Sequence, residues 1–372
     1  MMRRRTCLQW LAAPCVLSAC AKAPPLAEPR LRLLDVLGGD DTAGYLRASA
    51  PRAFSFPADH GPHAGFRNEW WYFTGNVDTA EGRRFGYQLT FFNSALRPPD
   101  SPGLSSAWDS PRVWMAHFAI TDAQGRTHDA VERFTRENPG LAGANDGRVW
   151  LEDWELRFGD DSRLWQLRAF DAASGMGIDF ALRQLKPPML QGRDGLSQKN
   201  LEPGNASYYY SLPRLSTGGT LRIGGQDFNV RGQSWLDREW STSALAPDQS
   251  GWNWFSLQFD DGQELMYYEL LDQNGNAHPQ SAGNWSSRDA QQTYITPAEI
   301  TLTPLATWTS PAGTVYVTCW ELAYAERRWR VDAVLQDQWM NLSLPYWEGA
   351  VDVSDAETNA PLGRGYVEMV RV

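Results

Sequence analysis

Cysteine is scarce in this sequence of 372 residues, and the positions of its four cysteines leave no pair for an internal disulfide. Cys7, Cys15 and Cys20 lie near the amino terminus, and Cys319 is the one cysteine in the body of the chain. A domain without disulfides must be held together by its hydrophobic core. The remainder of the chain, about 350 residues, is long enough for two cores of ordinary domain size.

The signatures of several common enzyme classes are also absent. The sequence shows no nucleophile elbow, phosphate loop, dinucleotide fingerprint or Ser-His-Asp arrangement, which argues against hydrolases, kinases and dehydrogenases. Histidine is rare, with five in the chain. His60 and His63 have a spacing that suits a metal, but no second pair of Cys or His ligands accompanies them. We therefore expect neither a metal nor another cofactor.

Long hydrophobic runs are missing, and the one apolar feature at the amino terminus is short. Arg3–Arg5 precede the mostly apolar run Cys7–Ser18, which is too short to cross a bilayer as a helix and is typical of a secretory signal. The run ends in Leu17-Ser18-Ala19-Cys20, which resembles a lipobox. We expect residues 1–19 to be a lipoprotein signal peptide and Cys20 to carry lipid. An ordinary signal peptide with an incidental cysteine is the alternative.

The predicted cellular location follows from the residues around Cys20. Ala21 stands where an aspartate would favour retention in the inner membrane, so we expect a cell-envelope lipoprotein in the outer membrane, facing the periplasm. A loose twin-arginine pattern at Arg4-Arg5 leaves the export route open. Residues 20–50 are rich in Ala, Pro and Gly, which predicts a tether with at most one short helix.

Basic residues are outnumbered by acidic residues over the whole chain. Lys and Arg number 34 against 44 Asp and Glu, a formal net charge of −10. Removal of the three signal arginines would leave −13. Such an acidic surface repels nucleic acid and anionic lipid, so the expected contact with the membrane is the lipid anchor, and no nucleic-acid partner is expected.

Alternation of apolar and polar residues with a period of two dominates the sequence from Phe54 onward. Short runs rich in aromatic and β-branched residues are separated by Gly, Pro, Asn and Asp, which predicts many strands and an all-β sandwich or barrel. The predicted strands are Glu69–Val77, Arg84–Asn93, Val113–Thr121, Gly147–Phe158, Trp165–Phe170, Met176–Leu185, Ser207–Leu212, Gly219–Ile223, Gln226–Gly232, Trp252–Phe259, Glu264–Leu271, Thr314–Tyr324, Arg328–Leu335 and Gly363–Val370.

A weak internal repeat indicates two similar halves. Trp70–Phe73 leads through a turn into the aromatic strand Phe85–Phe92, and Trp252–Phe255 leads in the same way into Leu265–Leu271. We therefore predict one domain over residues 51–215 and a second over residues 216–372. Two unrelated hairpins in one large sandwich are the alternative.

Two acids lie in an otherwise aromatic strand, at Asp237 and Glu239. On a regular strand they share one face, and two like charges on a partly buried face raise one pKa and leave a proton donor near neutral pH. The functional interpretation makes Asp237 a general acid and Glu239 the group that activates water. A structural ion-pair network, in which Arg238, Arg67 or His117 neutralises the acids, is the alternative.

The other candidate residues are a histidine and a set of mostly aromatic residues. His117 is the third candidate catalytic residue, because its imidazole can accept or donate a proton, although a satisfied core histidine is the plainer interpretation. Aromatic faces bind apolar ligands at low entropic cost, although most of these rings will be core. The predicted ligand-binding residues are Glu69, Trp70, Trp71, Tyr72, Tyr208, Tyr210, Trp235, Trp240, Trp252, Trp254 and Tyr268.

Several segments, in order along the chain, resemble the AttH and hydroxyneurosporene synthase (carotenoid 1,2-hydratase) family. The matching segments are Phe56–His63, Asn68–Gly75, Ala116–Asp122, Lys186–Pro188, Gly204–Ser211, Gly232–Ser241 and Gly251–Phe255. The resemblance implies two tandem lipocalin-like halves packed together. Its members include secreted proteins encoded beside ABC-transporter components, hydratases that add water to a terminal carotenoid double bond, and fungal proteins that shape polyketide cyclisation.

One motif departs from the hydratase branch of that family. There the resemblance implies an acid in a Tyr-x-Asp pattern with an upstream His-x-Trp pair. Here Trp235-Leu236-Asp237 keeps the acid without the tyrosine, and Tyr208–Tyr210 stand roughly where the His-x-Trp pair would be.

Two functions therefore remain open. The first is a lipoprotein that binds or hands over a bulky apolar small molecule or lipid, in association with ABC-transporter components. The second is a cofactor-free hydratase, isomerase or cyclase that acts on an isoprenoid or polyketide-like substrate with Asp237 as acid. A purely structural envelope protein is a third interpretation.

Overall fold

The computed structural model describes residues 42–101, 110–159, 161, 163–243, 246 and 248–371. The predicted signal peptide, Cys20 and most of the predicted tether lie outside these residues. Among the described residues the one helical element is a 3₁₀ turn, η1 (Ala58–His60), and the other regular elements are all β-strands, joined by turns and loops. No helix in this part is long and apolar enough to span a membrane. The predicted all-β fold is confirmed.

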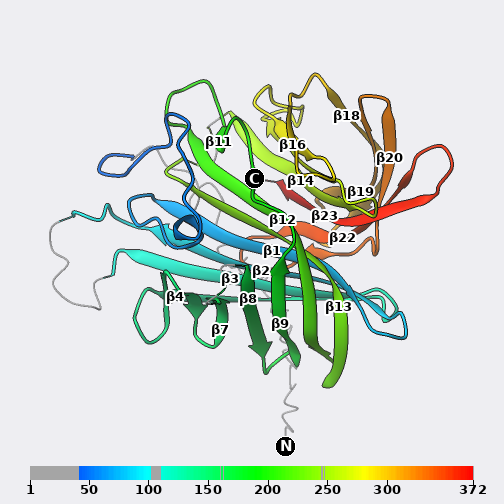
Figure 1. The fold of residues 1–372 in the computed structure, drawn as a ribbon, viewed down its shortest axis with the longest axis horizontal. Coiled ribbons are helices and arrows are strands. Elements are labelled where there is room, and N and C mark those ends of the chain that lie inside the picture. Colours follow the sequence, from blue (N-terminus) through cyan, green and yellow to red (C-terminus); the bar gives the residue numbers. More distant parts are fainter. Residues whose placement is uncertain are drawn as a thin grey trace, which may run out of the picture. The chain divides into compact units, whose positions relative to one another are not determined.

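The first sheet has thirteen strands, in the order β4-β3-β2-β1-β13-β12-β9-β8-β7-β6-β5, with β10 and β11 paired to β12. It forms the blue to green part of Figure 1. Its strands are β1 (Asn68–Asp78), β2 (Arg84–Ala95), β3 (Arg112–Asp122), β4 (Thr127–Arg136), β5 (Ala142–Asn145), β6 (Arg148–Leu151), β7 (Trp154–Phe158), β8 (Leu164–Asp171), β9 (Met176–Gln184), β10 (Met189–Leu190), β11 (Leu196–Gln198), β12 (Ala206–Ile223) and β13 (Gln226–Ser241).

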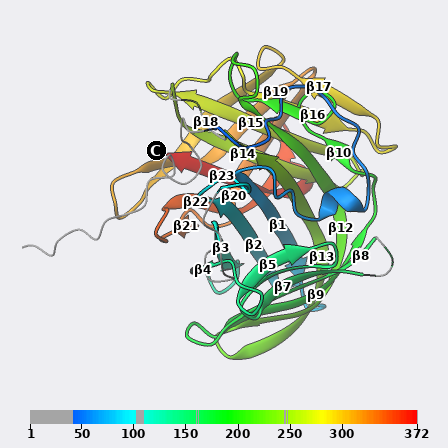
Figure 2. The ribbon, with the colours of Figure 1, turned by 90° about the vertical axis from the view of Figure 1, so that its left-hand side faces the viewer.

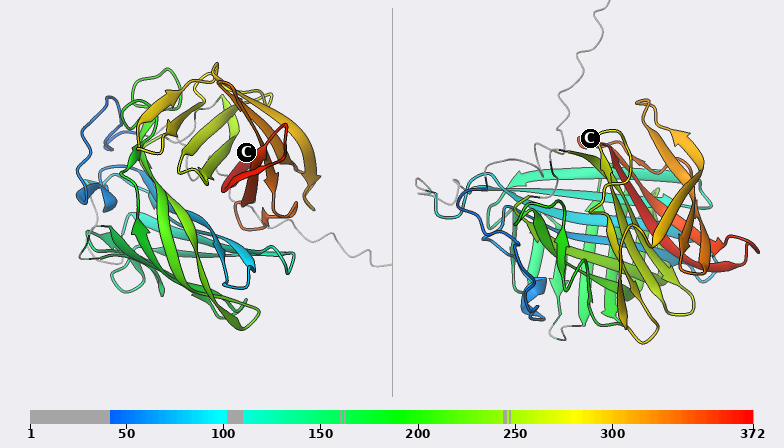
Figure 3. Two further views of the ribbon diagram at one scale, coloured as in Figure 1. Left: turned by 45° about the vertical axis from the view of Figure 1, so that its right-hand side comes forward. Right: turned by 90° about the horizontal axis from the view of Figure 1, so that it is seen from above.

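The second sheet has ten strands, in the order β17-β16-β15-β14-β23-β22-β20-β19-β18, with β21 paired to β22. Figure 3 shows its red carboxyl-terminal strand among the yellow and orange ones. Its strands are β14 (Gln249–Phe259), β15 (Glu264–Asp272), β16 (Ala282–Ser286), β17 (Gln292–Ile295), β18 (Ile300–Thr309), β19 (Val315–Tyr324), β20 (Arg327–Ala333), β21 (Trp339–Met340), β22 (Tyr346–Asp355) and β23 (Pro361–Arg371).

The two hairpins that suggested a repeat occupy equivalent places. β1 lies between β2 and the last strand of the first sheet, β13, and β14 lies between β15 and the last strand of the second sheet, β23. Both sheets curl (Figure 2), and each curl encloses its own cluster of buried hydrophobic residues. This is the arrangement of two lipocalin-like halves.

The boundary between the halves differs from the predicted one. A division at residues 215 and 216 falls inside β12, which pairs with β13 as far as Ser241. The predicted strands Ser207–Leu212 and Gly219–Ile223 are one long strand, because the register shift between Leu212 and Leu215 absorbs the proline between them. The first sheet therefore ends at Ser241 and the second begins at Gln249.

A second expected strand is divided in the structure. Gly147–Phe158 forms β6 and β7, which pair with each other through a tight turn at Glu152 and Asp153. Glu152 adopts a positive φ of 57° there. The alternation continues across the turn, so the pattern alone gave no sign of the reversal.

Polar and aromatic side chains of both sheets meet in the interior between them. A buried cluster there takes Tyr72 and Trp235 from the first sheet and Trp254 and Tyr268 from the second. At its edge Glu264 of β15 accepts hydrogen bonds from Lys186 and Arg214, at 2.6 Å each. The interior between the sheets is therefore built by both halves.

Candidate active site

Asp237 lies in the interior between the sheets, with 2% of its surface exposed. Ser211 Oγ and Trp235 Nε1 donate to its Oδ1 at 2.5 and 2.6 Å, and the Tyr209 hydroxyl donates to Oδ2. Trp254 Nε1, from the second sheet, donates to the Tyr209 hydroxyl at 3.1 Å. Burial raises the pKa of Asp237 to about 7, against the opposing effect of these hydrogen bonds.

Glu239 lies on the same face of β13 and meets a lysine. Lys199 Nζ lies 3.1 Å from Glu239 Oε1, and both side chains are buried. The ammonium also donates to Ser197 Oγ at 3.0 Å and lies 4.5 Å from the centre of the Tyr268 ring. Lys199 thus neutralises Glu239, whereas Asp237, on the same face of β13, has no cation in contact among the described residues.

The second sheet contributes two more carboxyls to this interior. Glu348 of β22 accepts a hydrogen bond from the Tyr72 hydroxyl at 2.5 Å, and Glu368 of β23 accepts one from Trp252 Nε1 at 2.6 Å. Burial raises the pKa of Glu368 to about 7 and raises that of Glu348 well above its usual range. The Tyr72 ring meets Trp254 edge-on, with centroids 5.1 Å apart.

His117 is buried beside these groups on β3. Its Nδ1 lies 2.8 Å from the hydroxyl of Tyr346, and its Nε2 lies 3.8 Å from Glu132 Oε2. Burial lowers the pKa of His117 to about 3, so the imidazole is neutral at physiological pH. It can relay hydrogen bonds but does not provide a positive charge.

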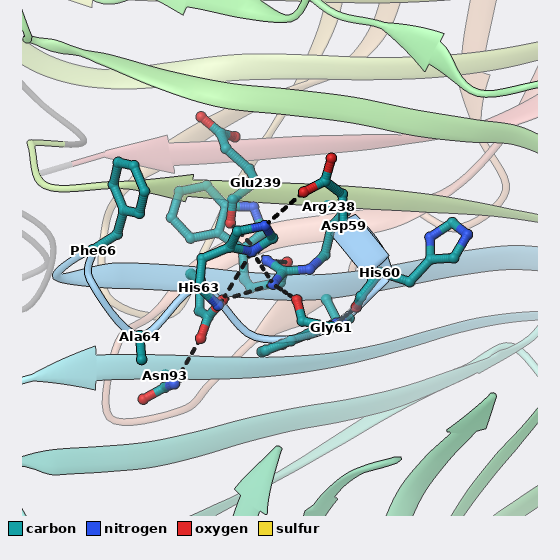
Figure 4. A network of polar contacts seen from close by, with 12 residues as sticks. Asp59, His60, Gly61, His63, Ala64, Phe66, Asn93, Arg238 and Glu239 are labelled. Atoms are coloured by element: carbon teal, nitrogen blue, oxygen red, sulfur yellow. Dashed lines mark hydrogen bonds and ion pairs between the residues drawn. The ribbon is translucent and has the colours of Figure 1, made fainter. Parts of the chain in front are cut away.

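A separate polar network lies on the opposite face of β13, around Arg238 (Figure 4). The buried guanidinium of Arg238 donates to Glu69 Oε2 and to the Gly61 carbonyl oxygen, at 2.6 Å each. It also stacks on Trp71, 3.8 Å from the ring centre. His63 stacks on Trp240 and lies 3.1 Å from Asp59 Oδ1. Figure 4 shows the carboxylate of Glu239 directed away from this network.

The predicted site residues lie in two separate places in the structure: the interior between the two sheets and the inside of the curl of the first sheet. Those in or against the interior between the sheets are Asp237, Glu239, His117, Trp70, Tyr72, Trp235, Trp252, Trp254 and Tyr268. Those that pack inside the curl of the first sheet, or join the Arg238 network there, are Glu69, Trp71, Tyr208, Tyr210 and Trp240. The second group does not share a site with Asp237, because neighbouring residues of a strand point to opposite faces.

Sequence reasoning missed several residues that contact the acids. Tyr209 faces Asp237, whereas the predicted Tyr208 and Tyr210 face the other way, because β12 pairs Tyr209 with Glu239. Glu348 and Glu368 could have been found from the sequence, because each is an acid within a strand that contains aromatic residues, which is the pattern that pointed to Glu69. Lys199 has no such signal, since it lies beyond a three-residue strand in a loop-rich segment.

The fold and this site define a class of two-sheet, lipocalin-like proteins with a buried carboxyl centre. Residues 47–371 match the family model described as AttH-like, and the chain belongs to that family. A crystal structure of an AttH-type protein from Nitrosomonas europaea is 31% identical, with a TM-score of 0.77, and the match covers 86% of this chain and 99% of the other. The comparison with curated proteins gave no match.

Two more distant structures share the fold. Kievitone hydratase from Nectria haematococca has a TM-score of 0.66 at 15% identity, covering 88% of this chain and 96% of its own. CghA with Sch210972 has a TM-score of 0.56 at 12% identity, covering 87% and 94%. At these identities the likeness is one of fold alone.

Proposed function

We propose that this protein is a cofactor-free acid–base enzyme of the hydratase, isomerase or cyclase type, which acts on a largely apolar isoprenoid or polyketide-like substrate. The observation that carries the proposal is the environment of Asp237: a carboxyl buried among aromatic side chains, with two hydroxyl groups as partners. In this surrounding the carboxyl is the proton donor and the aromatic rings hold the substrate.

The pKa of Asp237 suits that role. A pKa of about 7 means that the carboxyl holds its proton below neutral pH and releases it above, and a general acid works best near this point. The donor form is lost as the pH rises through 7, so turnover should fall on the alkaline side. The neighbouring hydroxyls of Tyr209 and Ser211 stabilise the carboxylate left after proton transfer.

The test is to incubate the protein with alkene substrates in heavy water. Kievitone, an acyclic carotenoid and a linear polyene form the panel, and a product with deuterium on carbon reports protonation. Asp237→Asn should lower kcat by about 10²–10⁴-fold with little change in KM, because the lost proton matters only in the transition state. Asp179→Asn, on an exposed carboxylate of β9, is the matched control. Full turnover by Asp237→Asn would contradict the proposal.

A carrier without turnover is the second candidate, and one observation favours it. Both oxygens of Asp237 already accept hydrogen bonds within the protein, so the carboxyl also serves to join β12, β13 and the second sheet. In a carrier no product forms with wild type, and Asp237→Asn changes affinity only modestly. Trp254→Ala should weaken binding in both cases, since aromatic area holds the ligand.

The setting we propose is the bacterial cell envelope. The lipobox-like segment that ends at Cys20 supports a lipid anchor, with the protein in the outer membrane facing the periplasm. ABC-transporter components that supply or remove an apolar ligand are the proposed partners, on the basis of the family resemblance.

A further inference from the structure

Glu348 and Glu368 stand directly opposite each other on β22 and β23. Side chains at directly paired positions of antiparallel strands lie within contact reach, and two like charges there are destabilising. Glu348 is 1% exposed, so water does not screen its charge. The pair is stable when one of the two carboxyls holds a proton.

Other buried glutamates of this protein are neutralised by cations. Glu69 meets Arg238, Glu239 meets Lys199, and Glu264 meets both Lys186 and Arg214. No lysine or arginine of the described residues makes an ion pair with Glu348 or Glu368. An uncompensated charge in the interior costs far more than a neutral carboxyl, which again requires a retained proton.

The partners of the pair leave it open to a further hydrogen bond. The Tyr72 hydroxyl donates to Oε1 of Glu348, and Trp252 Nε1 donates to Oε1 of Glu368. Glu348 Oε2 is buried and accepts no well-formed hydrogen bond in the described part of the chain, although the hydroxyl of Tyr346 lies close enough to lower the pKa of Glu348. Glu368 and Trp252 are only half-buried, so the Glu368 side of the pair remains within reach of water. A buried acceptor without a well-formed hydrogen bond marks a place for a polar group of a ligand or for water.

The pair faces the same interior as Asp237. Tyr72, which donates to Glu348, is directly paired with Asp237 in the register of β1 and β13. Its ring meets Trp254, which donates to the hydroxyl of Tyr209, the partner of Asp237. The charges of Asp237 and Glu239 also raise the pKa of Glu368, after burial as the main cause. The two carboxyl centres thus lie on opposite walls of one aromatic interior.

We propose that the Glu348–Glu368 pair is a second acid–base centre, which removes a proton from the water that attacks the substrate while Asp237 delivers one. The proposal rests on the proposed function. Asp237 gives its proton to one alkene carbon, and the π electron pair forms the new C–H bond. A lone pair of water forms the C–O bond at the other carbon, and the proton that this oxygen loses goes to the carboxylate of the pair. Return of that proton to Asp237 restores the enzyme.

The kinetic test uses any substrate that the alkene panel identifies. Glu348→Gln and Glu368→Gln should each lower kcat at least about 10²-fold with little change in KM, because removal of the base acts on the transition state. Glu321→Gln, whose carboxylate pairs with exposed Arg328 on β20, is the control and should keep wild-type kcat. Wild-type kcat in both pair variants would overturn this inference and leave the role of Asp237 standing. No turnover by wild type would instead overturn the proposed function.

An infrared measurement tests the retained proton without substrate. At about pH 8, where an ordinary glutamate is ionised, wild type and Asp237→Asn should show the carbonyl band of a protonated carboxyl. Glu348→Gln should lose or shift that band. Circular dichroism establishes that each variant is folded, and Tyr72→Phe, which keeps the ring and removes the donor to Glu348, should shift the same band. A band unchanged in the folded Glu348→Gln and Tyr72→Phe variants would overturn the proposal.

Discussion

Buried carboxyls of this protein fall into two groups. Glu69 illustrates the first: burial opposes its ionisation, but the charges of Arg238 and Arg112 and the hydrogen bond from His63 together outweigh burial and lower the pKa of Glu69 to about 2. Asp237 illustrates the second, in which burial prevails and raises the pKa to about 7. The first kind stabilises the fold as an ion pair, and the second kind holds a proton near neutral pH.

Removal of Arg238 should destabilise the protein strongly. Arg238→Met leaves Glu69 as a buried charge without a cation, which costs about 3–5 kcal/mol and should be seen in urea unfolding. Arg328→Met, in an exposed pair with Glu321, should cost at most about 1 kcal/mol. Equal effects of the two substitutions would contradict this account of Arg238.

The pH dependence of the same pair has a definite sign. The pKa of Glu69 is lower in the folded protein, at about 2, than the ordinary value of 4.5. Its contribution to stability is therefore complete above pH 4.5 and is lost as the pH falls towards 2. Arg238→Met should lack this part of the acid sensitivity.

At the scale of elements, β12 decides how the halves are built. It is the longest strand, at 18 residues, and it pairs with β9, β10, β11 and β13. Its Gly218-Gly219 step resembles a turn in the sequence but lies within the strand. Gly219 has a φ of 152°, and a Cβ there would lie 2.1 Å from the carbonyl oxygen of Asp179.

Two neighbouring substitutions in β12 should therefore behave differently. Gly219→Ala should lower the free energy of unfolding by about 1–3 kcal/mol or more, because the backbone conformation and the carbonyl of β9 both exclude a side chain. At Gly218 a Cβ would have its nearest neighbour at 3.8 Å, so Gly218→Ala should be close to neutral. Thermal unfolding of the two variants measures the difference, and equal melting temperatures would contradict it.

At the scale of the whole molecule, two curled sheets enclose separate apolar cores and share a polar, aromatic interior between them. Residues of both sheets are needed for each carboxyl centre, as Trp254 with Tyr209 and Tyr72 with Glu348 show. Neither half alone provides the site, which explains why a tandem arrangement is required for the proposed chemistry.

The anchor prediction belongs to this scale too. We expect the mature protein to begin at lipid-modified Cys20, since the segment before it has a basic start, a short apolar run and a lipobox-like end. Mass spectrometry of the membrane fraction should find an acylated amino-terminal cysteine. Cys20→Ser should release the protein from that fraction, and a soluble wild-type product that begins elsewhere would contradict the prediction.

The sequence by itself determined the all-β class, the family and the shared face of Asp237 and Glu239, because alternation along one strand is a local property of the backbone. The tertiary structure decided which residues meet these acids. Register between strands depends on turns and on irregularities such as the one at Leu212 and Leu215, so the sequence could not tell Tyr209 from its neighbours. The approach of Glu348 to Tyr72 across 276 positions of the chain depends on the packing of one sheet against the other, which no local pattern encodes.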